Sequence, residues 1–348
     1  MFMRCSMMLS QTQTQMETLY ERLEAIGLPE KFIREQALPN WWDEEFEDTP
    51  GAVVEAAAYI SRRLNLDINS LLEPQAAPTF KRSCVARFKT KQGIVVNELL
   101  ITHCIAARIA EMAAYACTTQ FKLVSDSAFV IRNKILSDRE FVDLEGLLNF
   151  CWSCGIPVVH FDRYPKSQDK FDGMVASFDH RPVIVISLNR CSRAWLAFIL
   201  AHELGHIIKG HASNTILIDE KVLLENPDIE EVEANQFAVE LLLGKPDIGY
   251  NFPAYLTGEG MADYARKISV RDRVDSGAVV LNNAWNKAIR VATSKEERII
   301  WATANKSLKI IEGDADAPSY INIYAQQYLD LDKLDVDSQD YLELAIME

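Results

Sequence analysis

The sequence lacks several features that would assign it to a special class of protein. Its 348 residues contain only six histidines, and its seven cysteines are an odd number without regular spacing. We therefore expect free thiols and a reducing, cytoplasmic environment. No run reaches the roughly 18 apolar residues that a membrane-spanning helix needs. The apolar stretch at the start is too short for a signal peptide. Neither an internal repeat nor a low-complexity segment is visible.

Positive charge is also scarce. The chain has 36 lysines and arginines against 50 aspartates and glutamates, a formal net charge of −14. Broad affinity for nucleic acid or an anionic membrane is therefore disfavoured, because phosphates would be repelled. The imbalance is strong between residues 20 and 74, where twelve acids face five bases. A basic protein partner would suit this charge better than DNA would.

The length predicts two or three modules, which we divide into four segments. Residues 1–77 show several short helices with tight turns, typical of a degenerate helix-turn-helix module. The acidic surface makes DNA binding unlikely, and a protein-docking or structural role is favoured. Residues 78–120 combine a basic linker with a long apolar helix over 94–117, in which His103 is predicted to be a core histidine. Residues 121–250 form a core, and 251–348 are mainly helical.

The core segment predicts an α+β order of elements. A helix over 141–154 is followed by strands at 156–161, 173–178 and 182–188, and then by a second helix. Cys151 and Cys154 form a C-x-x-C pair near the end of the first helix. A redox pair needs a helix start, and a zinc site needs a second pair, so we interpret both thiols as buried small residues.

The second helix carries the sequence HELGH, residues 202–206. On a helix, the i, i+4 spacing places His202 and His206 on one face, where both imidazoles can bind one cation. Glu203, one step round the helix, is suited to hold a water on that cation as general base. The competing interpretation is an ordinary helix with surface histidines.

A catalytic zinc normally has three protein ligands. Downstream, a helix is predicted from a capping box at Asp228 to Gly244. Its apolar stripe recurs every four residues and includes a carboxylate, Glu233. Burial of an unpaired carboxylate is costly, so Glu233 is predicted to be the third ligand. The alternative is a salt bridge from Glu233 to a buried arginine. Three glutamates fall off the stripe and are predicted to be solvated: Glu230, Glu231 and Glu240.

The three remaining histidines have weaker predictions. His211 lies one turn and one residue past His206, so it is expected to point away from the metal as a surface residue. His160 and His180 end or follow predicted strands, and we retain both as possible cleft residues. A strand at 173–178 or 183–188 is expected to pair with an extended substrate.

AHELGHIIKGH followed by EANQFAVELLL resembles the ImmA/IrrE family of bacterial metallopeptidases. GIPVVHF, DGMVASF and PVIVISLN are similar to strand segments of that family, and the resemblance covers roughly residues 126–245. It implies a small zincin-like core, a short twisted sheet plus the HExxH helix, of the minimal gluzincin kind. It also implies one zinc per chain on His202, His206 and Glu233, with Mn²⁺ as another possible metal, and Glu203 as general base.

Members of that family cleave or inactivate helix-turn-helix repressors, which derepresses stress, mobile-element or phage-defence genes. The resemblance thus implies a zinc endopeptidase whose protein substrate is a repressor encoded nearby. Residues 262–281 are similar to the segment that follows the protease core where the two modules are fused. Two alternatives remain open: a transcription regulator that uses the core for sensing, and a toxin–antitoxin component that uses it as a scaffold. The intact Glu203 disfavours a scaffold.

Overall fold

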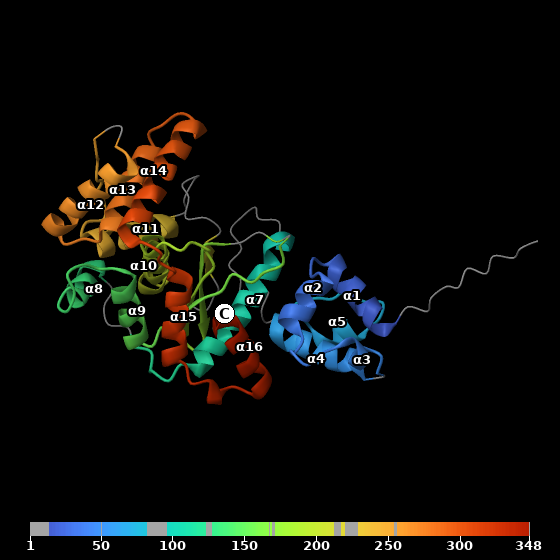
Figure 1. Cartoon of the computed structure of the whole chain (residues 1–348). Helices are drawn as coiled ribbons and strands as arrows, with labels where there is room; N and C mark the ends of the chain where they lie inside the picture. Colours follow the sequence, from blue (N-terminus) through green and yellow to red (C-terminus); the bar gives the residue numbers. More distant parts are fainter. Residues whose placement is uncertain are drawn as a thin grey trace, which may run out of the picture.

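The computed structural model describes residues 14–49, 51–81, 96–122, 127–166, 168, 171–211, 217–219, 229–253 and 256–347, the backbone alone for 96–99 and 217–219 (Figure 1). Most of the predicted basic linker and the predicted capping residue Asp228 lie outside these ranges. The protein is α+β, with a small sheet surrounded by helices, as the sequence predicted. Among the described residues, no helix combines the length and apolar character needed to cross a bilayer.

The N-terminal segment is a group of short helices. It contains α1 (Gln15–Ala25), α2 (Glu30–Phe32), a π-helical turn (Ile33–Ala37), α3 (Glu44–Glu47), α4 (Ala52–Leu64) and α5 (Ile68–Leu72). Side-chain caps begin three of them: Thr14 for α1, Asp43 for α3 and Asp67 for α5. Each cap accepts a backbone N–H that the first helical turn leaves unpaired. The predicted short helices and tight turns are present.

The central sheet has the strand order β1-β3-β2-β4. Its strands are β1 (Val158–His160), β2 (Gly173–Phe178), β3 (Arg181–Ile186) and β4 (Leu217–Asp219). β1 runs parallel to β3, whereas β2 is antiparallel to both β3 and β4. Asp179 and His180 both have positive φ and form the two-residue turn of the β2–β3 hairpin. The three predicted strands are found; β4 was not predicted.

Helices cover both faces of this sheet. α7 (Val96–Ala116) and α10 (Arg193–Lys209) both contact β2 and β3, and both faces of β3 are buried. α8 (Ala128–Ile135) and α9 (Leu144–Ser153) precede β1, and α11 (Ile229–Leu243) packs along α10. The HELGH helix is thus held between the sheet and α11, which fixes the direction of its side chains.

The C-terminal segment is helical, as predicted, but it forms two groups. α12 (Gly258–Asp272), α13 (Ser276–Ala288) and α14 (Ser294–Glu312) pack together, and α13 contacts α10. α15 (Ala317–Tyr328) and α16 (Val336–Met347) lie instead beside β1 and α7 (Figure 1). The four-part division of the chain stays a prediction.

Three polar contacts join distant parts of the chain. The amide of Asn322 on α15 bonds to both the backbone N and O of His160, at 2.9 and 3.0 Å, along the outer edge of β1. Glu312 at the end of α14 accepts bonds from the first backbone N–H groups of α10. Buried Arg63 on α4 forms an ion pair of 2.7 Å with Asp337 on α16.

Two predictions about single residues agree with their surroundings. Cys151 and Cys154 are buried, and burial raises the pKa of both thiols, so they stay protonated near neutral pH. His103 on α7 packs against the ring of Phe171, and burial lowers its pKa to about 3. A neutral core histidine is what the apolar helix predicted.

Candidate metal centre

The two HELGH histidines face one point. α10 begins at the cap Ser192 and runs unbroken through the motif. His202 and His206 are both buried, and their Nε2 atoms lie 3.0 Å apart. The i, i+4 spacing on a straight helix produces this convergence, as predicted.

The carboxylate that meets them belongs to Glu231. Its oxygens lie 3.5 Å from Nε2 of His202 and 3.8 Å from Nε2 of His206, and its side chain is 13% exposed. The potential ligand atoms of these three residues all lie within 4.8 Å of one another. Ligands bound tetrahedrally at about 2.0–2.1 Å would be separated by about 3.3 Å. The donor atoms and their spacing therefore fit a zinc-type site.

The prediction that Glu233 is the third ligand disagrees with this geometry. Its side chain is 47% exposed, and it forms an ion pair of 2.9 Å with His211 instead of facing the two ligand histidines. The error has a physical cause, because Ile229 at the start of the supposed apolar stripe is 77% exposed. The face of α11 that packs on α10 includes Ala234 and Ala238, and Glu231 precedes them on that face. The expectation that Glu231 is solvated was wrong.

Close contact between the two helices brings Glu231 into reach. A Cβ at Gly205 would lie 3.2 Å from the backbone Cα and O of Ala234, and 3.2 Å from the ring of Phe237. Because Gly205 has no side chain, the backbone of α11 can approach α10 closely at this point. Sequence reasoning missed this role, although a glycine within an apolar helix is a signal of close packing.

Asn235 fixes the orientation of His202. Its Oδ1 lies 3.1 Å from Nδ1 of His202, and an amide oxygen can only accept a hydrogen bond. Nδ1 therefore carries the proton, which leaves the lone pair on Nε2 directed at the metal position. Asn235 follows Glu231 by four residues, so both side chains lie on one face of α11. That face therefore supplies the candidate ligand Glu231 and the residue that orients His202.

His211 supports His206 in a similar way. Its Nδ1 lies 3.0 Å from Nδ1 of His206, and its Nε2 contacts Glu233. The prediction that His211 points away as a surface residue was wrong, because its side chain is only 8% exposed. The helix ends at Gly210, whose φ of +76° turns the chain back. A glycine at this position is the sequence signal of such a reversal.

Glu203 is fully buried and lies against β2. A Cβ at Gly173 would collide with its carboxylate. Glycine at the first position of β2 thus provides space for an ionisable group beside the two histidines. A buried carboxylate in this position can exchange protons with a bound reactant.

The two possible cleft histidines lie elsewhere in the sheet, at the end of β1 and in the β2–β3 turn. Nε2 of His160 lies 3.2 Å from the carbonyl oxygen of Leu188, and its backbone is bonded to Asn322. His180 is exposed at the β2–β3 turn, at the end of β2 opposite Gly173. His180 is far from Gly173 because the whole length of β2 separates them, and a strand advances about 3.3 Å per residue.

The predicted substrate strands are also paired within the chain. β3 is central, with β1 on one side and β2 on the other, so residues 184–186 are paired along both edges. β4 pairs with residues 173–175 of β2, at the end nearest Glu203. β4 is therefore the described strand at this edge of the sheet.

The fold and the site define a class of protein. It is an α+β domain in which an HExxH helix supplies two imidazoles and a second helix supplies a carboxylate that meets them. Residues 155–262 match the model of the Peptidase_M78 family, the IrrE N-terminal-like domain. This part of the chain is therefore similar to that peptidase domain, which confirms the resemblance in the sequence.

One curated protein is similar over a short region. "Uncharacterized immunity region protein 2" of Bacillus phage phi105 is 39% identical over 66 residues, which are 19% of this chain. The chain spans 41% of the length of that relative. No solved structure matches significantly.

Proposed function

We propose that the chain is a zinc-dependent endopeptidase that makes site-specific cuts in a regulatory protein. One observation supports it most: Glu203 is buried against Gly173 directly beside His202, one of three residues whose donor atoms converge. A general base next to a metal centre is the minimal equipment for metal-assisted hydrolysis.

His202, His206 and Glu231 would hold the metal. Two imidazoles and one carboxylate are a donor set typical of catalytic zinc, and Mn²⁺ is an alternative occupant. When bound there, the cation supplies a Lewis acid that polarises a peptide carbonyl and lowers the pKa of a bound water. Asn235 and the His211–Glu233 pair hold the two imidazoles in the required orientation.

Glu203 moves the proton. Its carboxylate would accept a proton from the attacking water and then donate it to the leaving amine. The sheet and α10 enclose this residue, so the transfer takes place away from bulk solvent. Glutamine at this position would keep the shape and remove the basic oxygen.

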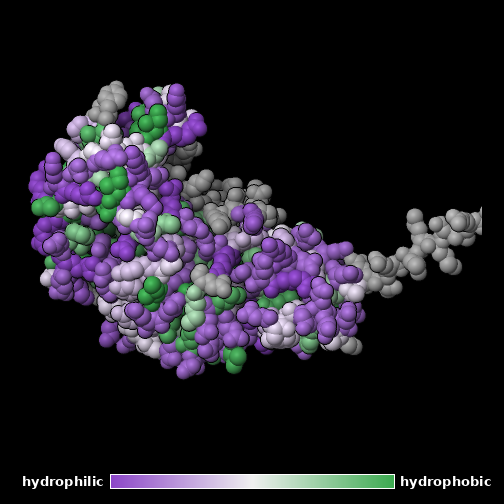
Figure 2. Space-filling model, in the orientation of Figure 1, coloured by the Kyte–Doolittle hydropathy of each residue, from purple (hydrophilic) through white to green (hydrophobic). Residues whose placement is uncertain are grey.

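The substrate is proposed to be a helix-turn-helix repressor encoded near this gene. The name of the phage relative places that protein in an immunity region, where a repressor would be found. The N-terminal helices would serve as a docking module, and not as a DNA reader. Their visible surface is mainly hydrophilic (Figure 2), and their sequence is acidic, which suits a basic protein.

Co-expression with the neighbouring repressor tests this proposal. We expect cleaved repressor with the wild type, none with Glu203→Gln, and normal cleavage with the control Glu240→Gln, which changes a glutamate of α11 outside the three converging residues. Mass spectrometry of the products would locate the cut. Equal cleavage by the wild type and by Glu203→Gln would refute the proposal that this chain is the protease. Repressor binding without any cleavage would favour a sensing or scaffold role.

A further inference from the structure

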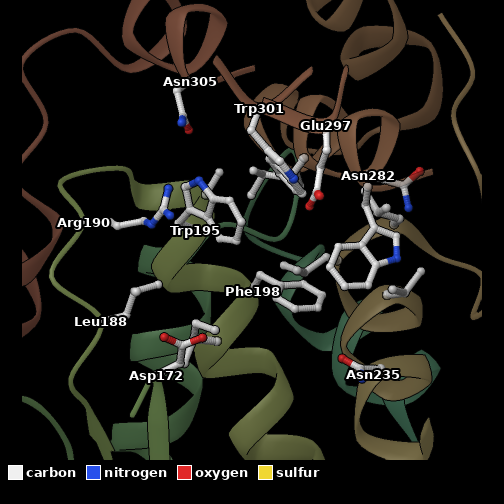
Figure 3. Close-up of a pocket in the computed structure, with 18 residues that line it drawn as sticks. Asp172, Leu188, Arg190, Trp195, Phe198, Asn235, Asn282, Glu297, Trp301 and Asn305 are labelled. Carbon is white, nitrogen blue, oxygen red and sulfur yellow. The ribbon is translucent and has the colours of Figure 1, made fainter. Parts of the chain in front are cut away.

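A cavity of about 490 Å³ lies next to the metal centre. Four helices surround it: the first half of α10, the second half of α11, and the facing sides of α13 and α14. Figure 3 shows Trp195, Phe198 and Trp301 directed into it, with Arg190, Glu297 and Asn305 around them. Its size is in the range of sites that bind small molecules or side chains.

The walls of the cavity are largely aromatic. The ring of Trp301 lies 5.3 Å from that of Trp195 and 6.5 Å from that of Trp285, at tilted or edge-on angles. The guanidinium of Arg190 lies 4.5 Å from the centre of the Trp195 ring. Tilted aromatic walls favour another ring or a bulky aliphatic group, because offset and edge-to-face contacts add to the gain from burial.

Two residues make the cavity continuous with the catalytic cluster. Asn235 lines the cavity and also bonds to His202. Asp172 lines it as well, and its neighbour Gly173 packs against Glu203. Figure 3 shows both polar residues on the same side of the aromatic group. The cavity and the metal centre therefore share the walls formed by Asn235 and by the Asp172–Gly173 segment.

We propose that this cavity is the specificity pocket of the peptidase, and that it takes a bulky apolar side chain, preferably aromatic, beside the scissile bond. The inference rests on the proposed function and adds the class of substrate to it. The occupant belongs to the substrate chain, because the cavity shares walls with the metal site. A single aromatic side chain buries about 150–250 Å² of surface. The pocket thus provides a large part of the discrimination between substrates.

Metal-anchored ligands test the pocket without any need for turnover. We would measure the binding of hydroxamates with a methyl, isobutyl, benzyl or naphthylmethyl side chain to the zinc-loaded full chain by calorimetry. The benzyl compound is expected to bind at least tenfold more tightly than the methyl compound. The matching carboxamides, which do not bind zinc strongly, are expected to bind far more weakly.

Val239→Phe should fill the cavity from α11, because Val239 lines it. We expect this variant to lose the benzyl preference and to keep the affinity for the methyl compound. Val270→Phe is the matched control, since Val270 on α12 is 85% exposed; it should keep the preference.

Three results would overturn the inference. Equal affinities across the side-chain series, with tight hydroxamate binding, would reject the pocket and leave the metal site intact. Carboxamides that bind as tightly as hydroxamates would indicate a separate small-molecule site. A lack of binding by every hydroxamate to the zinc-loaded protein would contradict the proposed function itself, and the pocket with it.

Discussion

The carboxylate of Glu233 lies 2.9 Å from Nε2 of His211, and the other nitrogen of that ring lies 3.0 Å from Nδ1 of His206. A carboxylate that sequence periodicity assigned to the metal therefore lies two residues behind the candidate metal position, after His206 and His211. Glu231 lies in the candidate ligand position, and Glu233 contacts the histidine that supports His206. The two glutamates differ in role although they are two positions apart on one helix.

Two alanine variants should separate these roles. Glu231→Ala removes a candidate ligand, so we expect the zinc content to fall well below one per chain. Glu233→Ala removes an outer partner, and such losses typically weaken metal binding about 10–100-fold without abolishing it. Measurement of zinc content and of affinity by chelator competition would test both. Normal zinc in Glu231→Ala together with loss in Glu233→Ala would restore the assignment made from the sequence.

Substitutions of Asn235 test the orientation of His202. Asn235→Leu removes the acceptor for the Nδ1 proton, and we expect zinc affinity to fall about 10–100-fold. Asn235→Asp keeps an acceptor oxygen at the same place and should retain most of the affinity. Competition with a zinc chelator at equal protein concentration is the measurement. Equal loss in both variants would indicate that the packing of Asn235, and not its hydrogen bond, matters.

Gly205→Ala should separate α10 from α11. The new methyl group would meet the backbone of Ala234, which cannot rotate away as a side chain would. We expect the second helix to shift by a few tenths of an ångström, which weakens zinc binding and costs about 1–3 kcal/mol in unfolding free energy. Chemical denaturation and zinc titration would check the two effects. An unchanged zinc affinity would show that Glu231 does not depend on this contact.

Asp275 predicts a dependence of stability on pH. Burial raises the pKa of its carboxyl to about 6, and the nearby carboxylates of Glu312 and Asp143 add to the effect. The folded state thus binds this proton more tightly than the unfolded state, so stability is lost as pH rises from about 4 through 6. Asp275 also caps α13 through the backbone N–H of Ala278.

Asp275→Asn keeps the cap and removes the charge, since either residue can accept that bond. We expect it to raise the melting temperature at pH 8 and to have little effect at pH 4.5. The control is Asp43→Asn at the exposed cap of α3, which should not show this difference. Thermal scans at the two pH values are sufficient. A stabilisation of equal size at both would mean that the charge of Asp275 is not its cause.

The elements that the sequence predicted correctly are those with strong local patterns. HELGH sits on a helix whose ends are fixed by Ser192 and Gly210, and strand β2 matches the segment 173–178. The errors at Glu231, Glu233 and His211 arise from contacts between elements. Which face of α11 meets α10 depends on the close approach at Gly205, and a period of four residues does not reveal that choice.

The same limit applies to the edges of the sheet and to the cavity. β4 has only three residues, and its pairing with β2 is set by a partner distant in sequence. The tryptophans of the cavity are spread over α10, α13 and α14, so no local motif joins them. Sequence patterns predicted a site of two histidines and one carboxylate, whereas the fold determined which glutamate meets the histidines.

Two of the contacts between distant residues affect the order in which parts of the fold are completed during synthesis. The open edge of β1 is bonded by Asn322, and the first turn of α10 is capped by Glu312. A ribosome releases the HELGH segment about a hundred residues before either partner appears, at about 5–20 residues per second. At that point the first turn of α10 lacks its Glu312 cap, and the edge of β1 lacks Asn322. The two elements next to the candidate metal centre are therefore completed only after the segment that carries Asn322 has been made.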